Sequence, residues 1–278
     1  MLPSVRFERG PHKMSADSIV VDGVTKNFTL RYHRSIKDIT VAKMKGRAVS
    51  NTFKALDDVT FTIKQGESVG LMGLNGSGKS TLLKLISGVM RPDQGTVKTR
   101  GQIAGLIATG AGFHPQLSGR ENIFLNAAIY GLSAEETAAI YDDVVKFAEL
   151  GDHLNSPVGN YSSGQYSRLG FSVAVHIDSD IFLADEVLAV GDKPFKKKCM
   201  EKMEEIRDSG RTVVYVSHAA GSVKRMCDRV ICLEKGRLVF DGDVDEGIEY
   251  LHYGEDDAKG SAKLKQLEAA DSALGAEV

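Results

Sequence analysis

The sequence predicts an α/β fold built on a parallel sheet. Apolar runs typical of buried strands alternate with segments of helical periodicity, and three of these runs, 67–72, 181–184 and 213–216, are followed directly by glycine or polar residues. Strands connected through helices form parallel sheets, and their carboxyl ends meet at one edge. Residues that follow the three runs are therefore expected to gather at that edge, where such folds bind ligands.

The first run leads into the glycine-rich stretch GLNGSGKST, which precedes a helical pattern. The stretch matches G-x-x-x-x-G-K-[ST] in its required strand–loop–helix context. In such a loop the backbone N–H groups wrap phosphates, the lysine reaches the β- and γ-phosphate oxygens, and the Ser after it offers a hydroxyl to Mg²⁺. The sequence thus predicts a phosphate-loop NTPase core. Its candidate nucleotide-binding residues are Gly73, Asn75, Gly76, Ser77, Gly78, Lys79, Ser80 and Thr81, with Ser80 also a candidate Mg²⁺ ligand.

The second run, DIFLADE, ends in two carboxylates. Asp185 is predicted to hold Mg²⁺, directly or through water, and Glu186 to polarise the attacking water. An apolar run that ends in Asp-Glu is common, and on its own it indicates a strand end with solvated carboxylates. The phosphate loop upstream favours the catalytic interpretation.

A helix is predicted within YSSGQYSRLGFSVAVHI, Tyr161 to Ile177, because apolar or small residues fall at 166, 169, 170, 173, 174 and 177. Ser162 and Ser163 stand where helix N-caps stand. The helix would direct the positive end of its dipole and its free N–H groups at an anion beyond Ser162.

These elements, in this order, resemble the ATP-binding-cassette (ABC) ATPases over residues 18–241, and YSSGQ resembles the signature L-S-G-G-Q of that family. The resemblance implies an α/β phosphate-loop NTPase core with an antiparallel β subdomain and an inserted helical subdomain at about 113–178. It implies two ATP molecules, with Mg²⁺, buried in a head-to-tail homodimer. The signature residues that would contact the partner's ATP are Ser162, Ser163, Gly164 and Gln165.

The resemblance assigns roles to three further residues. Asp192, in VLAVGD, matches the family's D-loop aspartate at the dimer seam. His218, after the 213–216 run, is expected to contact the γ-phosphate and act in catalysis. Phe28 falls where the family places an aromatic on the adenine face; a core phenylalanine of the β-sheet is the alternative, and Tyr32 is a weaker candidate for the stacking role.

The sequence also departs from the family pattern. Tyr161 replaces the usual leucine and Ser163 the first glycine, and the Q-loop glutamine aligns with Thr109. Gln116 is out of register for that role, so His114 and Gln116 are interpreted as loop-packing residues. What replaces the Q-loop glutamine stays open.

Three segments, 110–132, 161–178 and 184–199, resemble the ATPase subunits that export lipid-linked polysaccharides such as O-antigen or teichoic acids. In such transporters, separate transmembrane permease subunits bind to the helical subdomain. Here Arg120, Glu121 and Asn122 would lie at the start of that subdomain. A peripheral location on the cytoplasmic face of the inner membrane is implied. Two alternatives remain: an ABC transporter ATPase for another substrate, and a soluble ABC ATPase that acts on nucleic acid. The net charge of −2 gives no reason to expect a nucleic-acid partner.

Outside these motifs, residues 1–17 are expected to be a flexible leader, with Met14 an alternative start, and 242–278 a helical, acidic tail. Strands are predicted at 18–30 and 55–63. The insert 31–54 between them carries seven Lys or Arg and one Asp. It could lie on an anionic membrane, meet the lipid-linked substrate, or be a solvated loop. The sequence contains no membrane-spanning run and no CxxC pair among its three cysteines, which are expected to be reduced and inert. Residues 1–13 lack the apolar core of a signal peptide, so none is expected.

Overall fold

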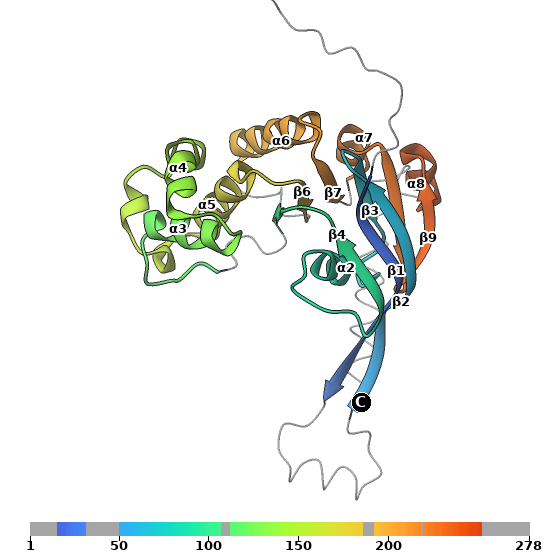
Figure 1. Cartoon of the computed structure of the whole chain (residues 1–278). Helices are drawn as coiled ribbons and strands as arrows, with labels where there is room; N and C mark the ends of the chain where they lie inside the picture. The colour runs from blue at the N-terminus through green and yellow to red at the C-terminus, as the bar shows by residue number, and fades with distance from the viewer. Residues whose placement is uncertain (1–15, 32–49, 107–111, 186–191, 218, 252–278) are drawn as a thin grey trace, which may run out of the picture.

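The computed structural model describes residues 16–31, 50–106, 112–185, 192–217 and 219–251, and Figure 1 shows their arrangement. Two sheets and a group of helices make up the fold. The antiparallel sheet has the order β2-β1-β4. Its strands are β1 (Asp17–Arg31), β2 (Ser50–Lys64) and β4 (Gln94–Thr99).

The strands β1 and β2 confirm the two predicted strands but are longer at the insert. Their pairing runs from Asp17↔Lys64 to Arg31↔Ser50, so β2 begins inside the segment that the sequence assigned to the insert. The predicted bounds 31–54 were therefore too wide, because antiparallel pairing continues along the hairpin. Residues 32–49, with Tyr32 and most of the basic side chains, lie outside the described residues.

The second sheet confirms the predicted parallel core. Its order is β5-β6-β7-β3-β8-β9, and every neighbouring pair is parallel except β8 with β9. The last two strands form a hairpin that turns at Lys235 and Gly236, both of which have positive φ. The strands are β3 (Ser68–Met72), β5 (Ile103–Gly105), β6 (Ile181–Ala184), β7 (Thr212–Val216), β8 (Arg229–Glu234) and β9 (Arg237–Gly242).

Alternate side chains of the parallel strands face two different cores. In β6, Ile181 and Leu183 pack with α2 (Lys79–Ile86) and the antiparallel sheet. Phe182 and Ala184 pack with the helices of the opposite face. Because both faces are covered, β3, β6 and β7 are buried along their whole length and are mostly apolar, as parallel strands usually are. The opposite face carries α6 (Lys193–Asp208) and α7 (Ala220–Met226).

The helical subdomain lies to one side of the sheets in Figure 1. Three of its helices begin with a serine capping box, in which the serine hydroxyl and the side chain three residues later each accept a hydrogen bond from the other residue's N–H. The caps are Ser118, Ser133 and Ser162. The elements are α3 (Gly119–Ile129), α4 (Ala134–Ala148), η1 (Gly151–Asn155), η2 (Val158–Asn160) and α5 (Ser163–His176).

The chain beyond 241 does not separate from the domain at once. Strand β9 extends to Gly242, and α8 (Val244–Tyr250) buries Val244 and Ile248 in the core beside the parallel sheet. The first part of the expected tail is thus packed against the rest of the domain, because one face of α8 is apolar. Among the helices of the described segments, none combines the length and apolar character that a membrane span requires.

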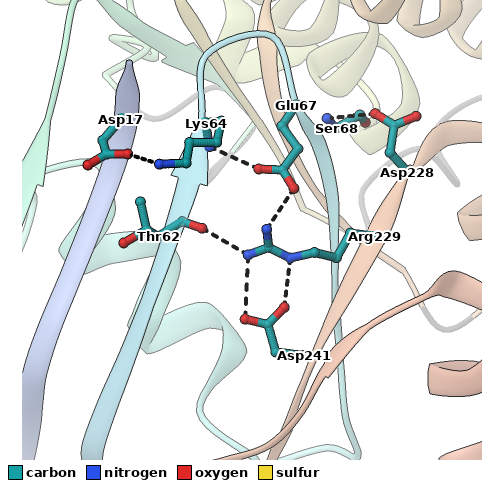
Figure 2. A network of polar contacts seen from close by, with 8 residues as sticks. All are labelled: Asp17, Thr62, Lys64, Glu67, Ser68, Asp228, Arg229 and Asp241. Carbon is teal, nitrogen blue, oxygen red and sulfur yellow. Dashed lines mark hydrogen bonds and ion pairs between the residues drawn. The ribbon is translucent and has the colours of Figure 1, made fainter. Parts of the chain in front are cut away.

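A polar network joins the two sheets, and Figure 2 shows it. The guanidinium of Arg229 (β8) forms ion pairs with Glu67 at 2.7 Å and with Asp241 (β9) at 2.6 Å, and donates to the carbonyl of Thr62 (β2) at 2.8 Å. The Glu67 carboxylate also accepts from the N–H of Lys64. One arginine therefore fixes the position of the antiparallel sheet against β8 and β9.

Candidate functional site

The phosphate loop joins the carboxyl end of β3 to α2, and its backbone is held on two sides. Gly73 has φ 142°, and a Cβ there would lie 2.2 Å from the carbonyl oxygen of Leu233. The N–H of Gly236 donates to the Ser77 carbonyl at 3.0 Å, and a Cβ on Gly78 would lie 2.6 Å from the Ala55 oxygen. Strand β2 and the β8–β9 turn thus set the loop's shape, and glycine is required at both positions.

The loop presents positive charge to its pocket. Lys79, 7% exposed, curls back so that its Nζ donates to the carbonyls of Gly73 at 2.6 Å and Leu74 at 3.0 Å. Gly78 is the N-cap of helix α2 and provides no side-chain cap. The N–H groups of the first turn can therefore donate hydrogen bonds to a ligand. A helix N-terminus beside a lysine is an arrangement that binds phosphate groups.

One pocket of about 260 Å³ gathers most of the predicted nucleotide site. It brings the phosphate loop together with Asp185, which follows β6, and with Phe28 of β1. Its lining residues are Phe28, Phe53, Lys54, Ala55, Asn75, Gly76, Ser77, Gly78, Lys79, Ser80, Thr81 and Asp185.

The oxygen donors of Ser80 and Asp185 in this pocket suit a hard cation such as Mg²⁺. The described residues hold no group of three or more metal-ligating side chains.

An aromatic pair forms the pocket's apolar wall. Phe28 faces Phe53 across the β1–β2 ladder, with ring centroids 5.6 Å apart and planes 24° from parallel. Phe53 is 45% exposed, which is unusual for so large an apolar side chain. Sequence reasoning found Phe28 and missed Phe53, since the cross-strand pairing that brings the rings together is visible only in the register.

The signature residues stand at the exposed N-terminus of α5, as predicted. Ser162 is the N-cap and Ser163 the first helical residue. The Ser162 hydroxyl accepts from the Gln165 N–H at 3.2 Å, and Gln165 Oε1 accepts from the Ser162 N–H at 3.0 Å. Both serines are exposed and Gly164 is half-buried. The pocket of the same chain includes none of them, so the structure does not bring the signature to its own phosphate loop.

Asp192 caps α6 by accepting from the Phe195 N–H at 3.4 Å, and it forms an ion pair with Arg168 of α5.

Glu186, His218 and Thr109 lie outside the described residues. The loop-packing interpretation agrees with the contacts of His114 and Gln116: the His114 N–H donates to Asn122, and His114 Nδ1 accepts from the Gln116 N–H.

Two other features lie apart from this site. A polar hollow of about 480 Å³ is lined by Asp178, Ser179 and Arg211 among others, at the amino ends of β6 and β7, and includes no predicted site residue. The cysteines are buried, and burial raises the pKa of Cys199, Cys227 and Cys232 to about 12. Their thiols are therefore protonated at neutral pH, as expected for inert cysteines.

The fold and the pocket define a phosphate-loop nucleotide-binding protein. Residues 56–189 match the ABC transporter family. The chain is 39% identical over 269 residues to ABC transporter protein AbcA of Aeromonas salmonicida, covering 95% of this chain and 87% of the relative. It is 42% identical over 234 residues to the O-antigen export system ATP-binding protein RfbB of Klebsiella pneumoniae, covering 81% and 94%. With the teichoic acids export ATP-binding protein TagH of Levilactobacillus brevis the identity is 44% over 220 residues, covering 79% and 60%.

A solved structure agrees with this. The ATP-binding cassette MJ0796, in a dimeric post-hydrolysis state bound to ADP and Pi, superimposes with a TM-score of 0.64 at 25% identity and covers 81% of this chain and 98% of that one. The chain belongs to the ABC transporter family. It is a nucleotide-binding, ATP-hydrolysing transport ATPase.

Proposed function

We propose that this chain energises an exporter that moves a lipid-linked cell-envelope polysaccharide across the cytoplasmic membrane. It acts as a homodimer, with separate transmembrane permease subunits, at the cytoplasmic face. The observation that carries the proposal is the phosphate-loop pocket in a chain that aligns with 94% of an O-antigen export ATP-binding protein and with 60% of a teichoic acids export one. The names of these relatives supply the substrate class.

Each candidate residue has a role in this proposal. The phosphate loop binds the ATP phosphates, and Lys79 exchanges the carbonyls of Gly73 and Leu74 for the β- and γ-phosphate oxygens. Ser80 and Asp185 would hold Mg²⁺, which would supply charge that neutralises the phosphates. Phe28 and Phe53 give the adenine an aromatic surface.

Hydrolysis also needs groups at the γ-phosphate. Glu186 orients the attacking water, and His218 stabilises the charge that develops on the phosphoryl group. Ser162 and Gly164 of one subunit cover the γ-phosphate held by the other, with the N-terminus of α5 directed at that anion. Closure and reopening of the dimer move the helical subdomains, and these drive the permease.

The test is a strain whose only copy carries Glu186→Gln. Loss of the base is expected to slow ATP hydrolysis by about 10²–10⁴-fold while ATP binding survives. Finished lipid-linked glycan should then accumulate on the cytoplasmic side of the inner membrane. The matched control, Glu201→Gln, removes an exposed carboxylate of α6 and should leave export unchanged. No accumulation in a strain whose mutant ATPase is inactive would contradict the exporter assignment and leave an ABC ATPase for another substrate.

A further inference from the structure

Arg168 occupies a junction between the signature helix and α6. Its Nη2 lies 2.6 Å from Asp192 Oδ1, and its Cζ lies 4.4 Å from the centroid of the Phe195 ring. A third partner, Glu149 at the end of α4, lies 3.9 Å from Nη1. The Arg168 side chain is only 19% exposed, so stacking on the buried Phe195 ring restricts the orientation of the guanidinium.

The two ends of this ion pair belong to two elements already assigned to the dimer seam. On α5, Arg168 follows Gln165 by one helical turn. The side-chain oxygen of Gln165 accepts a hydrogen bond from the N–H of Ser162. On α6, the Asp192 carboxylate that pairs with Arg168 also accepts the N–H of Phe195. Arg168 thus lies one turn after the signature residues on the same helix, and its ion pair connects that helix to Asp192, the residue that precedes α6.

We infer that Arg168 is a positioning residue that holds the signature and Asp192 of one subunit in a fixed arrangement, so that both meet the partner subunit together. The inference rests on the proposed function, because it requires an ATP-bound dimer. The Asp192 side of this ion pair is exposed to solvent, and such a pair by itself stabilises a fold little. The expected effect of losing this one is therefore on dimer closure, and the subunit's own ATP binding should be unchanged because the phosphate loop touches neither residue.

Two variants separate geometry from folding. Arg168→Met removes the cation and keeps a long apolar side chain over Phe195. Asp192→Asn removes the charge and keeps a good N-cap for α6. The measurement is ATP hydrolysis by the full chain as a function of protein concentration, together with a titration of a fluorescent ATP analogue at low protein concentration.

Both variants should raise the protein concentration that gives half-maximal specific activity by about tenfold, the size of a moderate coupling between sites. The double variant should be no worse than either single one, because the two residues act through one contact. The affinity for the ATP analogue should stay that of the parent chain, as should the melting temperature of Asp192→Asn.

The control is Lys198→Met in the same junction. Lys198 of α6 contacts Glu149 at 2.5 Å and the Phe147 carbonyl at 3.1 Å, and no contact of Asp192 depends on it. The dependence of ATP hydrolysis on protein concentration should be the same in Lys198→Met as in the parent chain. An equal rise of the half-maximal protein concentration in Lys198→Met would overturn the inference and leave the proposed function intact. So would parental behaviour in both Arg168→Met and Asp192→Asn. A parent chain without ATP hydrolysis at any concentration would overturn the proposed function, and the inference with it.

Discussion

At the scale of single residues, the pocket combines charged and aromatic groups. Lys79 and the first turn of α2 line it, and so do the stacked rings of Phe28 and Phe53. A nucleotide has the same division, with phosphates at one end and a flat base at the other. The partial exposure of Phe53 leaves ring surface available to a base.

The substitutions Phe28→Ala and Phe53→Ala should each weaken nucleotide binding. Stacking of a base on an aromatic ring contributes about 1–3 kcal/mol, which is about 5- to 150-fold in Kd. Because stacking tolerates every base, ATP and GTP should lose similar affinity. Equilibrium titration of the purified chain measures this.

Phe124→Ala supplies the matched control, since Phe124 is an exposed ring of α3 in the helical subdomain and lies outside the pocket. It should bind nucleotide as the parent does. Parental affinity in Phe53→Ala would mean that this ring only packs against Phe28.

The sequence was informative about the residues whose neighbours are close along the chain. The phosphate loop, Asp185 and the Ser162 cap depend on local spacing, and the structure places them where that spacing predicts. Phe53 could not be found in this way. Its contact with Phe28 depends on the register of two strands separated by a long insert, and only the fold fixes that register.

At the scale of elements, α4 and α5 begin with the same motif in different settings. Ser133 and Ser162 both accept a hydrogen bond from the N–H three residues later, at 3.2 Å in each case. In the described part of the chain, the Ser133 hydroxyl bonds only within its own helix. The proposed function makes the cap of α5 also the signature serine, so the same substitution should have different consequences at the two positions.

Ser133→Ala and Ser162→Ala should each destabilise the fold by about 0.5–2 kcal/mol, the usual cost of losing an N-cap. Ser133→Ala should hydrolyse ATP like the parent. Ser162→Ala should lose about 10²- to 10³-fold in rate, because a hydroxyl that contacts the phosphoryl group is also lost. Chemical denaturation and steady-state ATPase assays measure the two effects separately. Equal rates in the two variants would remove Ser162 from the site.

At the scale of the whole molecule, the relative position of the two sheets decides the shape of the pocket. Phe28 and Phe53 come from the antiparallel sheet, and the phosphate loop comes from the parallel one. The Arg229 network in Figure 2 joins the sheets through residues far apart in sequence. No local pattern in the sequence indicates such a connection, and sequence reasoning did not find it.

Arg229→Met should destabilise the fold by about 1–3 kcal/mol, because it leaves two carboxylates and a carbonyl without their charged partner. For a chain of this size the melting temperature should fall by about 3–9 °C. Lys64→Met is the control in the same region. It removes an exposed ion pair with Asp17 and should cost less than about 1 kcal/mol. Equal losses would show that the network adds nothing beyond surface charge.

The central claim is that each ATP is bound between the phosphate loop of one subunit and the signature of another. Mixing two inactive chains, Lys79→Met and Ser162→Asp, tests it most directly. A mixed dimer has one site with both defects and one with neither. When subunits pair at random, half of the dimers in an equimolar mixture are mixed, and half of their sites are intact. The mixture should therefore recover about a quarter of the parental ATPase rate. If loop and signature of the same chain formed the site, no mixed dimer would contain an intact one, and a mixture no more active than its separate components would contradict the account.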